Sequence, residues 1–322
     1  MRVLVTGGAG FIGSHLCEQL VNRGDKVFVL DDLSTGRFEN IEHLPGVECL
    51  IDSTLNQEIV RDLVREVDVV YHLAATVGVQ LVVDQPIQTI VNNIRGAETV
   101  MEETCRYRRK LLITSTSEVY GKGASEIFRE DDDRVLGPTH LHRWCYAASK
   151  QIDEFLALAY WRAKRHPVVV VRLFNTVGPR QTGRYGMVVP NFVRAALRNE
   201  NVRVFGDGKQ SRCFTYVGDV VPALVKLMDS SAVNGEIFNI GSRAKVTIEE
   251  LAKRIIAKTG STSQIEYVPY DKAYGEGYED MRHREPCLEK IHAAIGYEPK
   301  TGLDEIIDNV IAYMKPRIGA EN

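Results

Sequence analysis

The stretch that decides the fold is the N-terminal run Met1-Arg-Val-Leu-Val-Thr6-Gly-Gly-Ala-Gly-Phe-Ile-Gly13. Its apolar, β-branched segment Val3–Val5 predicts a short strand that is buried on both faces. The glycines follow in the spacing G-x-x-G-x-x-G, and the helical pattern Ser14–Arg23 comes directly after them. Such a turn lets backbone approach a pyrophosphate, which the free N–H groups of the helix N-terminus then hold. Because a strand precedes the glycines and a helix follows them, we predict a dinucleotide site rather than an ordinary turn. Its expected contacts are Gly7, Gly10, Phe11, Ile12 and Gly13.

The composition narrows the class of protein. The chain has 322 residues, 44% hydrophobic and 26% charged, which is enough for two lobes with a large core. Its net charge of −3 argues against a nucleic-acid or anionic-membrane partner. The six cysteines form no C-x-x-C pair, and glycines interrupt the N-terminal apolar run, so neither a disulfide framework nor a secretion signal is expected. We expect a cytoplasmic protein without a membrane span or a metal site.

Strand-like and helix-like segments alternate through the first half of the chain, the pattern of right-handed βαβ units. We therefore predict an α/β fold of the Rossmann type, with a doubly wound parallel sheet formed by residues 1–173. The alternation loosens over residues 174–322, where we predict a smaller lobe that binds substrate beyond the carboxyl ends of the strands. A strand near residues 236–240 is expected to rejoin the main sheet.

Three further strand ends are expected to complete the dinucleotide site. Asp31 and Asp32 end the second predicted strand, at the usual distance from the glycines for an acid that bonds the adenosine ribose. A carboxylate there accepts from the ribose hydroxyls and repels a 2′-phosphate, so NAD is favoured over NADP. Asp52 and Ser53 follow the third strand, near the adenine. The fourth strand, Asp68–Leu73, leads into the small residues Ala74 and Ala75, which let the cofactor lie close, and Leu73 is expected to contact it as well.

Two stretches carry residues suited to catalysis. Thr114-Ser-Thr-Ser-Glu-Val-Tyr-Gly121 presents hydroxyls and one carboxylate just past the fifth predicted strand. Tyr146 and Lys150 are four residues apart on a predicted helix and therefore share one face. An ammonium beside a phenol favours the phenolate and lowers the tyrosine pKa, as a general base for an alcohol requires. Together with the dinucleotide loop, the pair predicts a catalytic site with Tyr146 as the base.

These motifs identify a family resemblance that covers essentially the whole chain. They are Thr6–Gly13, Asp31–Gly36, His72–Ala75, Tyr146-x-x-x-Lys150 and Gly206-Asp-Gly208. With them, the chain resembles the extended short-chain dehydrogenases/reductases that modify nucleotide sugars with NAD. The resemblance implies that Tyr146 takes the proton of the sugar 4-hydroxyl while hydride passes from C4 to NAD⁺. It also implies that Lys150 holds the nicotinamide ribose and that Thr116 hydrogen-bonds the 4-oxygen of a UDP-sugar.

Narrower motifs resemble those of UDP-glucuronate decarboxylases, the UDP-xylose synthases. They are Ser115–Gly121, Arg143-Trp-Cys-Tyr146, Lys209–Thr215 and Tyr274–Pro286. By this resemblance Ser117 and Glu118 act at the sugar ring, and a transient 4-ketone accepts the electrons left when carbon dioxide departs. It implies that Arg212 and Arg284 hold the nucleotide ribose and diphosphate and that Asn175 seats the phosphate. The other substrate contacts expected are Val77, Arg184 and Val189.

Four alternatives stay open: 4-epimerisation, 4,6-dehydration, an apiose-type ring contraction and a dinucleotide-binding regulator without catalysis. Thr76-Val-Gly-Val79 is more similar to the corresponding loop of UDP-sugar 4-epimerases, which share Gly186–Asn191 as well, although Glu118 is unusual for them. A 4,6-dehydratase would carry Asp in place of Ser117. A different class of function is a dinucleotide-binding regulator without catalysis, which would be expected to lack the Tyr146–Lys150 pair. The family resemblance further suggests a homodimer formed through two long helices near residues 86–106 and 147–165.

Overall fold

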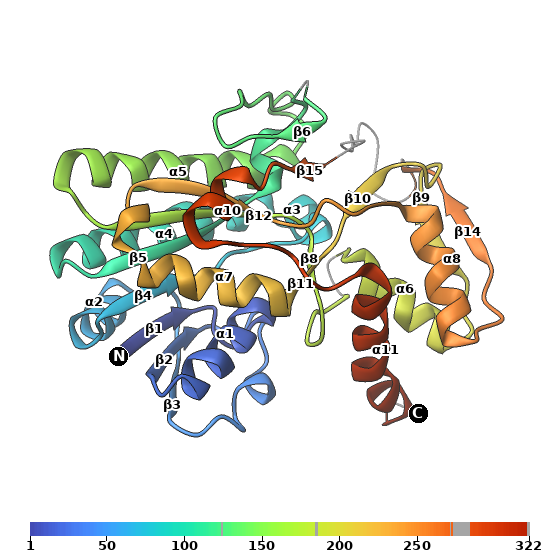
Figure 1. Ribbon diagram of the computed structural model, residues 1–322, viewed down its shortest axis with the longest axis horizontal. Helices are drawn as coiled ribbons and strands as arrows, with labels where there is room; N and C mark the ends of the chain where they lie inside the picture. The colour runs from blue at the N-terminus through green and yellow to red at the C-terminus, as the bar shows by residue number, and fades with distance from the viewer. Residues whose placement is uncertain (124, 184–185, 271, 273–283, 321–322) are drawn as a thin grey trace.

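The computed structural model describes residues 1–123, 125–183, 186–270, 272 and 284–320. Seven strands form its central sheet: β1 (Arg2–Thr6), β2 (Lys26–Asp31), β3 (Val47–Ile51), β4 (Val69–His72), β5 (Lys110–Thr116), β7 (Val168–Leu173) and β12 (Glu236–Ile240). Their order is β12-β7-β5-β4-β1-β2-β3, and every pairing is parallel (Figure 1). The chain winds outward from β1 in both directions, so the predicted doubly wound Rossmann-type sheet is confirmed.

Helices cover both faces of this sheet. The helices α1 (Phe11–Asn22), α7 (Val217–Asp229) and α10 (Glu289–Ile295) pack on one face, and α2 (Gln57–Glu66), α4 (Pro86–Arg106) and α5 (Trp144–Lys164) pack on the other. Successive strand residues alternate between the two cores: Val3 and Val5 lie in the first, and Leu4 lies in the second. Burial on both faces explains why the strands read as continuous apolar runs.

A second group of elements lies to one side of the sheet (Figure 1). It comprises α6 (Val188–Leu197), β9 (Val202–Phe205), α8 (Ile248–Thr259), β14 (Ile265–Val268) and α11 (Leu303–Ala320). The three helices and β9 share a separate hydrophobic core, to which Phe192, Leu251 and Ile307 contribute.

The remaining described elements are short. They are η1 (Phe38–Asn40), α3 (Val79–Asp84), η2 (Ser117–Tyr120), β6 (Ile127–Phe128), β8 (Thr176–Val177), β10 (Ser211–Cys213), β11 (Thr215–Tyr216), η3 (Ser231–Val233), β13 (Lys245–Thr247) and β15 (Glu285–Pro286). Two pairings among them join distant parts of the sequence: β8 pairs with β11, and β6 pairs with β15.

The structure also changes two expected boundaries. The apolar run Leu111–Thr114 predicts a strand that ends at Thr114, but β5 continues to Thr116, because Ser115 and Thr116 pair with Arg172 and Leu173 of β7. The sequence also predicts a short helix over Leu303–Met314, whereas α11 runs to Ala320. The strand extension matters because it places the Thr116 side chain on the rigid end of a strand rather than on a loop.

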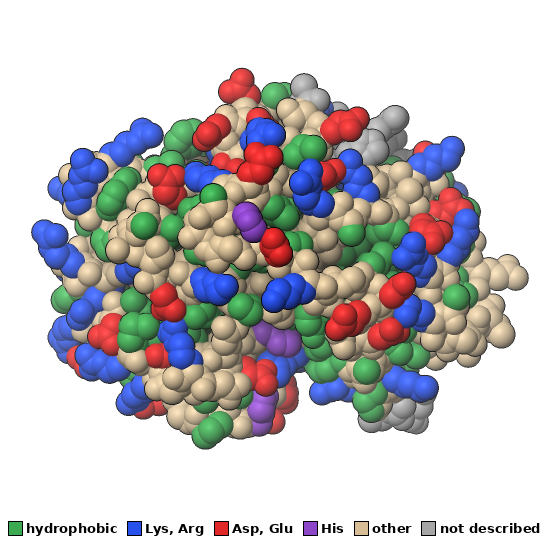
Figure 2. Space-filling view, in the orientation of Figure 1, with side chains coloured by type: hydrophobic (Ala, Val, Ile, Leu, Met, Phe, Trp, Pro, Cys, Tyr) green, Lys and Arg blue, Asp and Glu red, His purple; other side chains and the backbone are tan. Residues whose placement is uncertain are grey.

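The surface carries no broad region of a single charge on the face shown in Figure 2, where acidic and basic side chains are interspersed. In the part of the chain that the structure describes, no helix combines the length and apolarity needed to cross a membrane.

The close packing of the glycine turn generates a stability prediction. A Cβ atom on Gly13 would lie 2.1 Å from the Gly7 carbonyl oxygen, so Gly13→Ala forces the backbone apart. We expect it to lower the free energy of unfolding by about 1–3 kcal/mol, measured by urea denaturation. Gly302→Ala is the matched control, because a Cβ there meets no atom within 4 Å, and it should change stability by less than about 0.5 kcal/mol. Equal stability of the two variants would contradict the assignment.

Candidate active site

The turn between β1 and α1 forms one wall of a cavity of about 190 Å³. Gly7 has φ +74°, and a Cβ atom there would lie 2.7 Å from the backbone nitrogen of Ala74. The turn can therefore approach the end of β4 only because Gly7 lacks a side chain. The first turn of α1 opens onto the same cavity through Gly10, Phe11, Ile12 and Gly13. Its unpaired N–H groups suit the diphosphate of a dinucleotide.

The acids expected to bind ribose line this cavity, and they also hold the loops around it. The Asp31 carboxylate accepts hydrogen bonds from the backbone nitrogens of Ala9 and Leu33, each at 2.9 Å. Asp32 is exposed and accepts from the backbone and hydroxyl of Ser34. Asp31 thus fixes the glycine turn against the end of β2, and both carboxylates border the space that a ribose would occupy.

The other walls come from the ends of β3 and β4. Asp52 and Ser53 line the cavity from β3, and Leu73, Ala74 and Ala75 line it from β4. Below them, the Thr6 hydroxyl and the His72 Nδ1 lie 2.7 Å apart. Burial lowers the pKa of His72 to about 3, and the charge of Lys150 lowers it too, so this imidazole is neutral. The shape and donor groups of the cavity fit an adenine dinucleotide.

A larger cavity of about 910 Å³ adjoins the first and shares part of its wall with it. The shared residues are Phe11, Ile12, Leu73, Ala75, Val77, Thr114 and Leu173. Six basic side chains line the larger cavity against three acidic ones, among the residues that the structure describes: Arg143, Lys150, Arg194, Arg203, Arg212 and Arg284 against Glu118, Glu200 and Glu266. Although the chain is acidic as a whole, this cavity is built for an anionic ligand.

Thr116, Tyr146 and Lys150 meet in the larger cavity. Burial raises the pKa of the Tyr146 phenol well above its ordinary value, the charge of Glu118 raises it further, and a hydrogen bond with the Thr116 side chain lowers it in part. The expectation that Lys150 lowers the pKa of Tyr146 is therefore wrong when only the protein's own groups act on the phenol. The reason is that the Lys150 ammonium lies 3.1 Å from a carboxylate oxygen of Asp153, in an almost fully buried ion pair.

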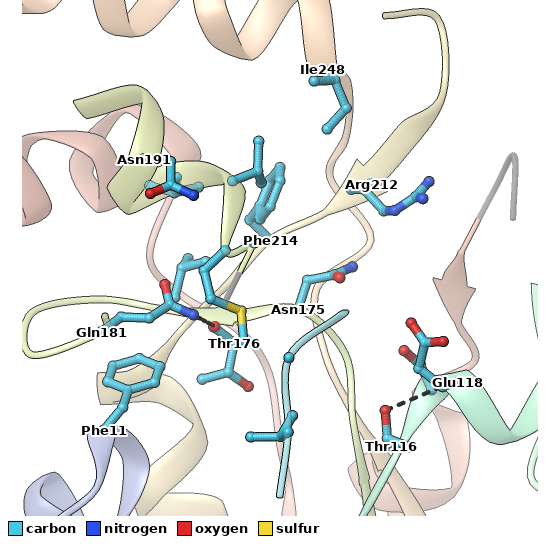
Figure 3. Close-up of a pocket in the computed structure, with 18 of the residues that line it drawn as sticks. Phe11, Thr116, Glu118, Asn175, Thr176, Gln181, Asn191, Arg212, Phe214 and Ile248 are labelled. Atoms are coloured by element: carbon cyan, nitrogen blue, oxygen red, sulfur yellow. Dashed lines mark hydrogen bonds between the residues drawn. The ribbon is translucent and has the colours of Figure 1, made fainter. Parts of the chain in front are cut away.

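Glu118 lies between two arginines that are far apart in the sequence. Its carboxylate oxygens are 2.8 Å from Nη2 of Arg143 and 2.5 Å from Nη1 of Arg284. Burial opposes its ionisation, but the guanidinium charges of Arg284 and Arg143 outweigh burial, so the pKa of Glu118 lies below its ordinary value. The Thr116 hydroxyl accepts from the backbone nitrogen of Glu118 at 3.2 Å, which fixes the turn between them (Figure 3). Ser117 lines the same end of the cavity.

The residues expected to bind substrate mostly surround this cavity. Asn175 lines it from the segment after β7, Val189 from α6 and Arg212 from β10, and Val77 lines it from the loop after β4. Figure 3 shows Glu118 and Arg212 at one side of the cavity and Phe11 and Gln181 at the other. Arg284 contacts Glu118 at the same end as Thr116. Arg184 lies outside the described residues.

Several lining residues escaped sequence reasoning. Arg143 precedes Tyr146 by three residues in a motif that we compared as a whole, and nothing in its spacing indicated a contact with Glu118. Gln181, Met187 and Asn191 also line the cavity. Gln181 stands among turn-forming residues that give no periodic signal, whereas Met187 and Asn191 belong to the motif Gly186–Asn191, which indicated a resemblance but no individual contact.

Comparison with known proteins agrees with this geometry. Residues 3–241 match the profile of the NAD dependent epimerase/dehydratase family. The chain is 42% identical to the UDP-N-acetyl-alpha-D-glucosaminuronate decarboxylase of Bacillus cytotoxicus, over 98% of each chain. It is 36% identical to UDP-glucuronic acid decarboxylase 1 of Arabidopsis thaliana, over 99% of this chain and 71% of that protein.

A solved structure is similar along the whole chain as well. The UDP-glucuronic acid 4-epimerase of Bacillus cereus, in complex with UDP-glucuronic acid and NAD, superimposes with a TM-score of 0.87 at 27% identity, over 98% of this chain and 100% of that one. The family profile, these relatives and the two adjoining cavities lead to one conclusion: the chain belongs to the NAD dependent epimerase/dehydratase family and is an NAD-dependent enzyme.

Proposed function

We propose that this enzyme decarboxylates a UDP-hexuronate through a transient 4-ketone. The observation that carries the proposal is the placement of Glu118 between Arg143 and Arg284, beside Thr116 and Tyr146. The named activities of its relatives from Bacillus cytotoxicus and Arabidopsis thaliana support it. In this division of labour, residues 1–173 with β12 hold the cofactor, and residues 174–322 mainly hold the nucleotide sugar.

The chemistry follows from what each side chain can do. NAD, when bound, supplies the acceptor for the hydride of C4 and later returns it. Tyr146 takes the proton of the 4-hydroxyl, Thr116 hydrogen-bonds the same oxygen, and Lys150 orients the nicotinamide ribose. The C4 ketone lies β to the C6 carboxylate, so the C5–C6 bond breaks, C6 leaves as carbon dioxide and the electron pair of that bond forms an enolate. The enolate takes a proton from water at C5, and Tyr146 returns its proton to the 4-oxygen as the ketone is reduced.

The charge at the Glu118 end suits a uronate substrate. Arg143 and Arg284 both contact the Glu118 carboxylate, and Arg212 also acts on it electrostatically. Three guanidinium groups thus act at this end of the cavity, and guanidinium groups bind carboxylates in well-defined geometry, which favours a sugar that carries a carboxylate. Neutral UDP-hexoses lack that group, so we propose that they are poor substrates.

A 4-epimerase is the second candidate. The loop Thr76–Val79 favours it, and so does the likeness to the UDP-glucuronic acid 4-epimerase of Bacillus cereus. Epimerisation uses the same proton and hydride transfers but keeps the carboxylate, so the two functions differ in the mass of the product.

Product mass decides between these functions. We expect purified enzyme with NAD⁺ to convert UDP-glucuronate or its 2-acetamido analogue to a product lighter by one carbon dioxide, as measured by mass spectrometry. Both substrates are assayed because the names of the two relatives give different ones: an N-acetylated UDP-hexuronate for the first and UDP-glucuronic acid for the second. A product of unchanged mass with inverted C4 would replace the proposal with epimerisation.

The role of Tyr146 is tested with the same assay. Tyr146→Phe removes only the hydroxyl that exchanges the proton, so kcat should fall about 10²- to 10⁴-fold. Tyr160→Phe on the same helix is the control and should leave kcat near the wild-type value, because Tyr160 does not line the cavity. Full activity of Tyr146→Phe would remove Tyr146 from the mechanism.

The pKa of Tyr146 provides a second prediction, on pH dependence. The Glu118 charge raises this pKa, so Glu118→Gln should lower it and make the phenolate available at lower pH. We expect the acidic limb of the kcat/KM profile to shift to lower pH, even though turnover itself is slower. Glu200→Gln, at an exposed residue that also borders the cavity, should leave the limb in place. A shift to higher pH would contradict the assignment.

We also propose that the enzyme is a cytoplasmic homodimer joined through α4 and α5. These helices pack side by side and expose apolar side chains. Ile87 on α4 is 78% exposed and Phe155 on α5 is 68% exposed. Ile90 and Ile152, each three residues from one of these, are exposed as well. Two copies of the helix pair would bury this surface as a four-helix bundle.

The proposed cytoplasmic location rests on the cysteines. All six cysteines are free thiols, which supports a reducing compartment.

Sedimentation equilibrium tests the dimer. Phe155→Glu places a charge in the centre of the proposed interface and should convert the dimer to monomer. Phe38→Glu changes an equally apolar, exposed residue in η1 and should leave the dimer intact. A wild-type protein that sediments only as a monomer would remove the proposal.

A further inference from the structure

A buried polar cluster lies directly beneath the catalytic side chains, and the mechanism above does not use it. Its centre is Arg172 of β7, which is 0% exposed. Its Nε and Nη2 donate to the two carboxylate oxygens of Glu154, each at 2.8 Å. Its Nη1 donates to the Tyr120 hydroxyl at 2.7 Å, and that hydroxyl donates to Oδ1 of Asn239 at 2.7 Å.

Two members of the cluster, Glu154 and Tyr120, belong to segments that carry reacting groups. Glu154 stands eight residues after Tyr146 and four after Lys150 on α5. The Ser115 hydroxyl, beside Thr116 on β5, donates to Glu154 at 2.6 Å. Tyr120 ends the turn η2 that holds Glu118. The cluster thus joins the base on α5 to the residues at the end of β5.

Asn239 extends these connections to Arg284. Its side chain donates to the carbonyl oxygen of Phe128 in β6 at 3.0 Å, and the same carbonyl accepts from the backbone nitrogen of Cys287 at 2.8 Å. These bonds hold β15 beside β6, and Arg284 immediately precedes β15. The three elements that supply Tyr146, Glu118 and Arg284 therefore meet at one set of buried hydrogen bonds.

We propose that Tyr120, Glu154, Arg172 and Asn239 are positioning residues, which set the placement of Tyr146, Thr116 and Glu118 relative to one another. The inference rests on the proposed catalytic role of these three residues. A bidentate arginine–carboxylate pair has one geometry, and the hydroxyl of Tyr120 is held from two sides. Small displacements of reacting groups slow chemistry far more than they weaken binding, because the transition state depends on alignment.

Tyr120→Phe is the sharpest test because it removes one oxygen atom and keeps the ring, which stacks on Phe128 with centroids 4.6 Å apart. We expect kcat to fall about tenfold or more, with KM for the nucleotide sugar and the affinity for NAD⁺ changed less than about twofold. Ser115→Ala breaks the other connection, between β5 and Glu154, and should show the same division between kcat and KM.

Tyr297→Phe is the matched control. Its hydroxyl is also buried and donates one hydrogen bond, to the Gly241 carbonyl at 2.9 Å, but it makes no contact with the cluster. Thermal unfolding is measured for all variants, since a merely structural role predicts equal loss of stability and unchanged kcat in both tyrosine variants. That result, or a Tyr120→Phe variant in which only KM changes, would overturn the inference.

The outcome is separable from the proposed function. The mass of the wild-type product tests decarboxylation. The kcat of Tyr120→Phe relative to the kcat of Tyr297→Phe tests positioning, and it can be measured for any reaction that begins with oxidation of the 4-hydroxyl. If the wild-type enzyme epimerises its substrate, this ratio of kcat values still decides whether the cluster positions the base.

Discussion

Parallel pairing of the strands is the constraint on which the site depends. Because β1, β4, β5 and β7 all run in one direction, their carboxyl ends meet at a single edge of the sheet. The glycine turn, Leu73–Ala75, Thr116 and Asn175 follow these four ends, so residues from distant parts of the sequence must converge. The two cavities share a wall at this edge, which brings the cofactor and the sugar into contact.

Charge balance is the second constraint. Glu118 can remain ionised inside the protein because Arg143 and Arg284 lie against its two oxygens. Arg284 reaches it only because β15 pairs with β6, which belongs to the segment between η2 and α5. Conversely, the phenol of Tyr146 is buried beside a negative charge, and this chain's own groups favour its neutral form. The same cavity therefore lowers the pKa of one acid and raises the pKa of one phenol.

Local patterns in the sequence predicted most of the sheet and part of the site. Apolar runs predict strands over Lys26–Asp31 and Val47–Ile51, and helical periodicity predicts a helix from about Pro86 to Arg106. All three elements have these bounds in the structure, because both patterns are local signals. The glycine turn and the Tyr146–Lys150 spacing are local as well. The contacts of Glu118 are not, since they join residues 25 and 166 positions away. The Lys150–Asp153 pair has a local signal as well, because side chains three residues apart on a helix are neighbours. The spacing alone does not show whether Lys150 turns to Asp153 or to Tyr146.

The buried cluster around Arg172 shows why such contacts are difficult to read from sequence and why the fold contains them. A buried ion pair contributes little net stability, since desolvation of both charges offsets most of their attraction, and well-packed apolar residues often serve as well. Stability alone therefore gives no reason for Arg172 and Glu154 to stand in the core. The directionality of their hydrogen bonds gives a reason. A guanidinium and a carboxylate fix the angles of every group that they bind, whereas apolar contacts allow those groups to slide. In a site where Tyr146, Thr116 and Glu118 come from separate elements, fixed angles between those elements are what the chemistry requires.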